Sequence, residues 1–123
     1  MRLNRERVAV LPLVLKAKWY DMIASGDKRE EYRTSKNVIR QIERWVGRGT
    51  IEKKLLVVEF FLGYQKNRPH MAFTADIPVI RNDPSERAQD VLHFDWGEPC
   101  LRHYAIPLIE QVELYVPDRY SNV

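Results

Sequence analysis

Residues 13–33 read LVLKAKWYDMIASGDKREEYR, and this segment contains the end of a strand, a short helix and a second extended segment. Apolar residues recur at helical spacing over residues 16–25. Gly26 follows them, and glycine readily takes the positive φ that ends many helices. The sequence therefore predicts a short helix that ends at Gly26 and has extended chain on both sides.

The extended chain after this helix is densely charged. Side chains of an extended segment alternate between two faces, which puts Glu31 and Arg33 on one face of residues 27–33 and Lys28 on the other. Whichever face turns inward carries charge. We therefore expect ionised side chains to pack against the interior at this point.

Five other segments have the composition of strands. Residues 55–62 are almost continuously apolar, which indicates a strand buried on both faces, and residues 71–79 alternate as in a half-buried strand. The other three are residues 8–15, with an irregular point at Pro12, and residues 102–106 and 108–116, which Pro107 separates.

Two further helices are expected. Ser35 stands at the N-cap position of an amphipathic helix, which Gly47 and Gly49 are expected to stop. Residues 83–92 read as a short third helix, and residues 93–99 read as irregular chain. An order of β, α, β, α and then mostly strands has too much strand for a doubly wound α/β fold, so we expect an α+β fold: a small curled sheet or barrel with flanking helices.

The composition fits one domain over residues 1–123. The chain is 45% apolar and 30% charged, which favours a folded domain over a disordered tail. It has no apolar run long enough to span a membrane, and its first residues lack the apolar core of a signal peptide. A single cysteine, Cys100, fits a reducing compartment, so we expect a cytoplasmic protein with no membrane partner.

The net charge of +3 is unevenly distributed. Residues 1–54 carry 14 lysines and arginines against 7 acidic residues, whereas residues 55–123 carry 6 against 10. Part of the excess forms a line of cations at every fourth position of the second expected helix. This basic stripe can track a phosphate backbone or can be an ordinary solvated helix face. Its members are Lys36, Arg40, Arg44 and Arg48.

The charged segment resembles a family hallmark. Gly26, Lys28, Glu31 and Arg33 reproduce the pattern Gly-x-Lys-x-x-Glu-x-Arg after a short helix, as in the ASCH family, named for a domain of the activating signal cointegrator. Residues 103–109 also look like the closing strands of that family. The resemblance covers nearly the whole chain and implies a PUA-like barrel of about five or six strands with two or three flanking helices.

The resemblance implies that RNA or a modified nucleotide is the ligand. Lys28 and Arg33 beside one carboxylate make a cleft that is positive overall, in which the cations can hold a phosphate and Glu31 can accept from an exocyclic amine. The same residues can instead form a structural ion pair at the rim of a barrel. The expected ligand-binding residues are Lys16, Lys28, Glu31, Arg33, Lys36, Arg40, Arg44, Tyr64 and Tyr104.

Aromatic residues form a second candidate group. Tyr64, next to Gln65 in a loop after the long apolar strand, and Tyr104 can stack an unpaired base. Trp19 can join them, although its helical phase with Ile23 favours a place in the core.

Two other functions stay open. As a hydrolase, the chain would cut RNA or a modified nucleoside with Lys28 and Glu31 taking part, and the hydroxyl groups of Tyr20, Tyr32 or Tyr104 nearby. An amidohydrolase similar to this family uses a threonine nucleophile where this chain has Glu31, which is a poor substitute. Alternatively, the oppositely charged halves make a protein interaction module, with an oligomeric state that the sequence leaves open.

We expect no metal and no other cofactor. The possible metal ligands are scattered, and their spacings complete no four-ligand pattern. They are His70, His93, Cys100 and His103.

Overall fold

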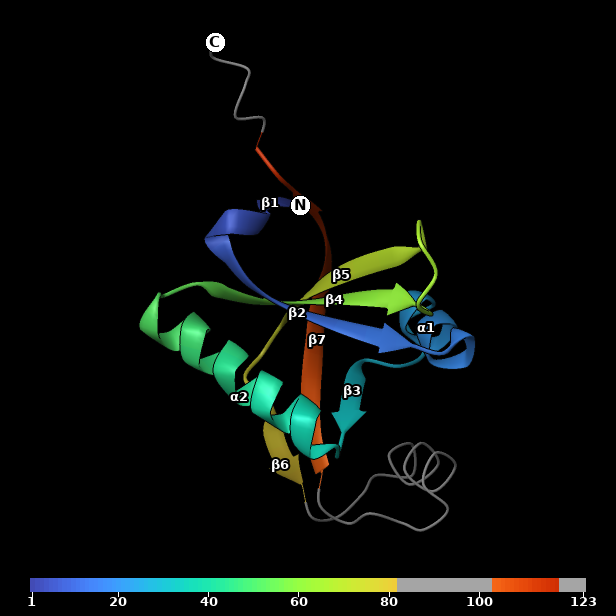
Figure 1. Cartoon of the computed structure of the whole chain (residues 1–123), viewed down its shortest axis with the longest axis horizontal. Coiled ribbons are helices and arrows are strands. Elements are labelled where there is room, and N and C mark those ends of the chain that lie inside the picture. Colours follow the sequence, from blue (N-terminus) through green and yellow to red (C-terminus); the bar gives the residue numbers. More distant parts are fainter. Residues whose placement is uncertain (82–102, 118–123) are drawn as a thin grey trace.

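The structure is a computed structural model, and it describes residues 1–81 and 103–117 (Figure 1). The described residues form seven strands, two α-helices and one 3-10 helix. In chain order these are β1 (Arg2–Asn4), η1 (Arg5–Arg7), β2 (Val8–Leu15), α1 (Ala17–Ala24), β3 (Glu30–Arg33), α2 (Lys36–Ile51), β4 (Leu55–Leu62), β5 (His70–Ala75), β6 (Val79–Arg81) and β7 (His103–Tyr115).

The strands form one mixed sheet around β7. This strand pairs with β1 in parallel and with β3, β5 and β6 antiparallel, and the path continues from β5 through β4 to β2. The β4–β2 pair at the end of the path is parallel. The α+β class is confirmed. Closure into a barrel is not observed among the described residues, because β1 and β2, at the two ends of the path, do not pair with each other. The described sheet has seven strands, where five or six were expected.

The main core lies between the sheet and the two α-helices. Trp45 of α2 and Phe60 of β4 are completely buried there, as is Ile106 of β7. The Trp45 indole Nε1 donates a hydrogen bond of 2.7 Å to the Ala9 carbonyl of β2, which fixes α2 against this strand. A smaller apolar cluster around Val57 covers the opposite face of the sheet.

The helices differ from expectation at their ends. Helix α1 lies where predicted, and Gly26 follows it with a φ of 85°. Helix α2 begins after Ser35 as predicted but runs through Gly47 and Gly49 to Ile51, so the expected stop at the glycines is wrong. Gly49 is buried against Leu56, and a Cβ at this position would also lie 3.2 Å from the Lys54 carbonyl oxygen. It therefore permits close packing and does not break the helix.

Two strand predictions also need correction. The predicted strand over residues 71–79 is two strands, because the chain leaves the sheet at residues 76–78, which include Pro78. Conversely, the two strands predicted on either side of Pro107 are one strand, β7. Pro107 is tolerated because β7 changes neighbours there: residues 103–107 pair with β3 and β6, and residues from Leu108 onward pair with β5.

Strand β4 confirms the prediction of a strand buried on both faces, although it contains a carboxylate. Glu59 is buried and accepts hydrogen bonds from Arg5, one of 2.7 Å to Oε1. His70 Nδ1 lies 3.5 Å from Glu59 Oε2. Strand β1 and η1, which carry Arg5 into this position, were not predicted. The predicted helix over residues 83–92 and the irregular segment over residues 93–99 lie outside the described residues.

Candidate functional site: a charged pocket beside helix α1

The end of α1 brings the first motif cation into the interior. Gly26 turns the chain back, and the Lys28 amide donates a hydrogen bond of 2.9 Å to the Met22 carbonyl of α1. The prediction that Lys28 lies opposite Glu31 across a strand is wrong, because β3 begins only at Glu30. Since Lys28 lies in the turn before the strand, its side chain can reach the same side as that of Glu31.

The motif side chains form a buried ion triad. Lys28 Nζ lies 2.7 Å from Glu31 Oε1, and Arg33 Nη2 lies 2.9 Å from Glu31 Oε2. Lys28 and Glu31 are only 3% and 2% exposed. The Tyr32 amide also donates to Glu31 Oε1 at 3.0 Å, and Arg33 donates to the Val14 carbonyl of β2 at 3.1 Å. The triad therefore joins β3 to the turn after α1 and to β2.

The triad holds Glu31 in its charged form. Burial by itself raises the pKa of this carboxyl, but the charges of Lys28 and Arg33 and their hydrogen bonds outweigh burial, so the pKa of Glu31 is lowered. Glu31 is consequently a carboxylate at neutral pH and acts only as a hydrogen-bond acceptor.

A pocket of about 340 Å³ opens beside the triad. Three cations and one anion line it, so it carries a net charge of +2, and aromatic rings of Trp19, Tyr32 and Tyr64 contribute to its walls. Lys28 Nζ lies 5.2 Å from the centre of the Trp19 ring and 5.4 Å from that of Tyr32. We call this the motif pocket; its lining residues are Val14, Leu15, Lys16, Trp19, Lys28, Glu31, Tyr32, Arg33, Gly63 and Tyr64.

The loop after β4 completes the motif pocket. The Gly63 amide donates a hydrogen bond of 3.1 Å to the Leu15 carbonyl at the end of β2, which holds this loop over the start of α1. Gly63 has a φ of 68°, which favours glycine, and Tyr64 follows it with 87% of its surface exposed. An exposed ring at the rim of a pocket is available for stacking.

Of the predicted binding residues, five meet in this pocket: Lys16, Lys28, Glu31, Arg33 and Tyr64. Trp19 both belongs to the core, as predicted, and forms a wall. Tyr104 does not line the pocket, and its hydroxyl lies 3.4 Å from Glu43 Oε1. Tyr20 and Gln65 also lie outside its lining.

The basic stripe is divided on the surface of α2. Lys36, Arg40 and Arg44 line no part of the motif pocket. Arg44 and Arg48 instead line a different hollow, between α2 and β2, which the sequence did not indicate. Its lining residues come from two segments, residues 10–12 and residues 41–52, so only the packing of α2 on β2 creates it.

The candidate metal ligands lie apart. His103 is buried edge-on against Tyr32, with ring centres 5.5 Å apart, while His70 lies beside Glu59 on the other face of the sheet. His93 and Cys100 lie outside the described residues. In the described part of the chain, no three side chains of the metal-ligating types gather at one point.

None of the described helices is long and apolar enough to cross a membrane. No family model, no curated protein and no solved structure matches this chain.

Proposed function

We propose that this chain is an ASCH-like domain that binds RNA or a modified nucleotide in the motif pocket. One observation carries the proposal: Lys28, Glu31 and Arg33, three of the four residues of the family pattern, meet at one pocket that is positive overall and has an exposed aromatic rim, and the fourth, Gly26, forms the turn before them. A positive pocket favours a phosphate, and an aromatic rim favours a base.

The pocket offers a separate group to each part of a nucleotide. Lys16 and Arg33 line the pocket and are placed to attract the phosphate. Arg33 pairs with Glu31 as Lys28 does, but the Arg33 side chain is 21% exposed and that of Lys28 only 2%. Glu31 Oε2 accepts from Arg33 and retains capacity for a second donor, such as an exocyclic amine. Tyr64 supplies the ring on which a base stacks.

Titration of fluorescently labelled single-stranded RNA and of a nucleotide panel, at low salt, tests this proposal. Tyr64→Ala is expected to weaken binding about 5-fold to 150-fold, because base stacking contributes roughly 1–3 kcal/mol. Gln65→Ala is the matched control, since Gln65 is the exposed neighbour of Tyr64 in the same loop but does not line the pocket. Lys16→Ala is expected to reduce the salt slope of RNA binding by about one unit.

The proposal fails if neither RNA nor any nucleotide binds at low salt. It also fails if Tyr64→Ala and Lys16→Ala both bind as tightly as the unaltered chain, because binding would then take place elsewhere.

Hydrolysis is separated from binding by incubating labelled RNA and acylated nucleosides with the protein. We expect the substrates to remain intact, since a carboxylate whose pKa is lowered, as that of Glu31 is, is a weak general base. Fragments or deacylated product that disappear in Lys28→Met would instead assign a hydrolase to the same pocket.

A further inference from the structure

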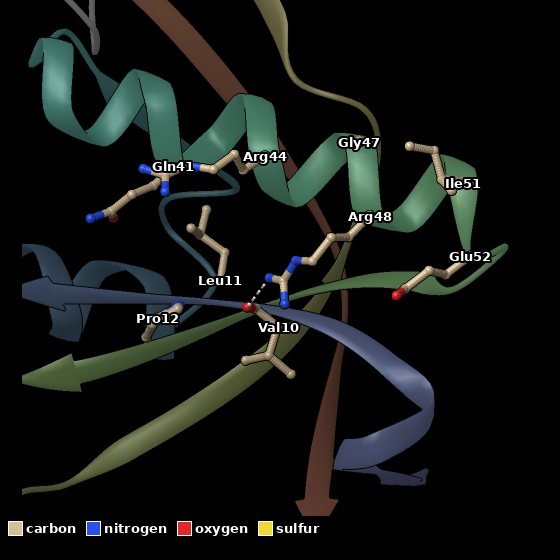
Figure 2. Close-up of a pocket in the computed structure, with 9 residues that line it drawn as sticks. All are labelled: Val10, Leu11, Pro12, Gln41, Arg44, Gly47, Arg48, Ile51 and Glu52. Carbon is tan, nitrogen blue, oxygen red and sulfur yellow. Dashed lines mark hydrogen bonds between the residues drawn. The ribbon is translucent and has the colours of Figure 1, made fainter.

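A second hollow lies between α2 and the outer edge of β2 (Figure 2). Its volume is about 680 Å³, within the range of roughly 300–1,000 Å³ that small-molecule sites occupy. It shares no lining residue with the motif pocket. We call it the arginine groove; it is lined by Val10, Leu11, Pro12, Gln41, Arg44, Gly47, Arg48, Ile51 and Glu52.

The apolar surface of the arginine groove is aliphatic. Pro12 lines it from β2 and is exposed, and Ile51 lines it from the end of α2 with 83% of its surface exposed, whereas Leu11 belongs to the core and is 3% exposed. Gly47 has no side chain to fill the groove from the helix side, and a Cβ built there would meet no atom within 4 Å. A glycine inside a helix costs about 1 kcal/mol relative to alanine, and packing does not require one here.

Two guanidinium groups border this aliphatic surface. Arg48 Nη2 donates a hydrogen bond of 3.2 Å to the Val10 carbonyl, which directs the side chain from α2 across to β2 (Figure 2). Arg44 donates through Nε to the Arg40 carbonyl at 3.4 Å. Each arginine has five N–H donors, so most donors of both remain for a ligand.

The groove carries excess positive charge. Glu52 is its only acidic lining residue, and Glu52 Oε2 lies 3.2 Å from Lys54 Nζ. Among the described residues, neither Arg44 nor Arg48 has a carboxylate within ion-pair distance. The favoured occupant is therefore an anion.

The groove is poorly suited to a β-strand or to a nucleic acid base. The carbonyls of Ala9 and Val10 on β2 already accept from Trp45 and Arg48, and Pro12 has no N–H to donate, so an added strand would find few partners. No aromatic ring is among the lining residues on which a base would stack.

We propose that the arginine groove binds a small amphipathic carboxylate with an unbranched alkyl chain. The chain lies on Pro12 and Ile51, and the carboxylate accepts hydrogen bonds from Arg44 and Arg48. This site is separate from the proposed nucleotide pocket and does not depend on it.

Isothermal titration calorimetry with three probes, each below its micelle concentration, tests the proposal. Decanoate provides both the chain and the carboxylate, butyrate keeps the carboxylate on a short chain, and decyltrimethylammonium keeps the chain with a cationic head. We expect decanoate to bind at least tenfold more tightly than either of the other probes.

Variants on α2 locate the binding. Gly47→Leu fills the groove at a position with open space and higher helix propensity, so it is expected to abolish decanoate binding while the unfolding temperature is kept or raised. Arg44→Gln is expected to weaken binding about tenfold. Lys36→Gln is the matched control, because it removes a cation of the same helix that does not line the groove.

Several outcomes would overturn the proposal. Equal binding of decanoate and decyltrimethylammonium would show an unselective apolar surface, and decanoate binding that survives Gly47→Leu would lie elsewhere. Binding of a helical peptide rich in leucine and glutamate, without decanoate binding, would assign the groove to a protein partner. RNA binding that is lost in Gly47→Leu would assign it to nucleic acid. Failure of RNA to bind at all would contradict only the proposed nucleotide site.

Discussion

Glu31 determines whether the motif pocket keeps its shape, because it is the one anion between two cations. Its carboxylate holds Lys28 and Arg33 at 2.7 and 2.9 Å, and both Glu31 and Lys28 are removed from water. A buried ion triad of this kind contributes little net stability, but it is costly to break, because the remaining charges stay buried without a partner.

Glu31→Gln is therefore expected to lower the free energy of unfolding by about 3 kcal/mol. The value lies at the low end for a buried pair because Arg33 is partly exposed and can recover hydration. Urea unfolding monitored by tryptophan fluorescence measures the loss. Glu52→Gln, which breaks the exposed pair with Lys54, is the control and should cost less than about 1 kcal/mol. Equal losses in the two variants would contradict the role of burial.

The pH dependence of this loss has a defined sign. The pKa of Glu31 is lower in the folded chain than in the unfolded chain, so its stabilising contribution is fully present above the unfolded pKa of about 4.3. The contribution decreases as the pH falls from there through the folded pKa. We expect the difference in unfolding free energy between the unaltered chain and Glu31→Gln to shrink steadily below about pH 4. A difference that grows on acidification would be inconsistent with a lowered pKa.

The sequence predicts the members of this site better than their arrangement. The spacing of Lys28, Glu31 and Arg33 identifies a charged group, and strand alternation places charge in the interior. Alternation assigns Lys28 to the wrong face because it assumes a regular strand where the chain turns after Gly26. The pairing of Arg5 with Glu59, 54 positions away, depends on how the chain folds back and has no local pattern.

At the scale of elements, α2 shows how tertiary packing overrides local propensity. Each of its two interior glycines costs about 1 kcal/mol of helix stability. Burial of Trp45 and Ile42 contributes roughly 2 kcal/mol each, and Trp45 adds a hydrogen bond to β2. The helix therefore continues past residues that would end an isolated one. The continuation of β7 through Pro107 has the same explanation, since it pairs with strands on both sides.

The two glycines of α2 are expected to respond in opposite directions to the same change. Gly47→Ala should raise the free energy of unfolding by about 1 kcal/mol, because the added methyl meets open space and helix propensity improves. Gly49→Ala should lower it by about 1 kcal/mol or more, because the methyl overlaps Leu56 and approaches the Lys54 carbonyl. Chemical denaturation of both variants checks the pair, and stabilisation by both would mean that α2 can move away from β4.

The predicted elements were most accurate where apolar periodicity and burial agree. Residues 8–15 and 55–62 are strands with the expected bounds, because each runs through the interior. Strand β1 was missed, since Arg2, Leu3 and Asn4 show no pattern of their own and are held in the sheet by β7. Local sequence cannot predict a strand whose extended form depends on a partner over 100 residues away.

At the scale of the whole molecule, a second buried carboxylate connects the start of the chain to the sheet. Glu59 is buried in β4, and Arg5 reaches it from η1 with hydrogen bonds to both oxygens. The interaction holds β1 and η1 over the smaller apolar cluster. The cations of residues 1–54 therefore lie partly in buried ion pairs and partly along the motif pocket and the arginine groove.

Arg5→Met is expected to lower the free energy of unfolding by about 3 kcal/mol, because it leaves the Glu59 carboxylate buried without its cation. Hydrogen exchange should show the loss as faster exchange of the amides of β1. Arg2→Met is the control, because its pair with Glu113 is long, at 3.8 Å, and well exposed; with its contact to the Tyr115 ring, 4.5 Å from the ring centre, it should change stability by less than about 1 kcal/mol. Unchanged exchange in β1 after Arg5→Met would show that β7 alone holds this strand.

The central position of β7 has a consequence for synthesis of the protein on the ribosome. Strands β1, β3, β5 and β6 all pair with residues 103–115, which form the last of the described strands along the chain. At about 5–20 residues per second, β1 waits roughly 5–20 s after its own synthesis before its partner is made. During this interval the β2–β4–β5 part of the sheet can form with α1 and α2, while the edge of β5 that later receives β7 stays unpaired. The nascent chain is therefore most vulnerable to aggregation along β5 until residue 115 leaves the exit tunnel.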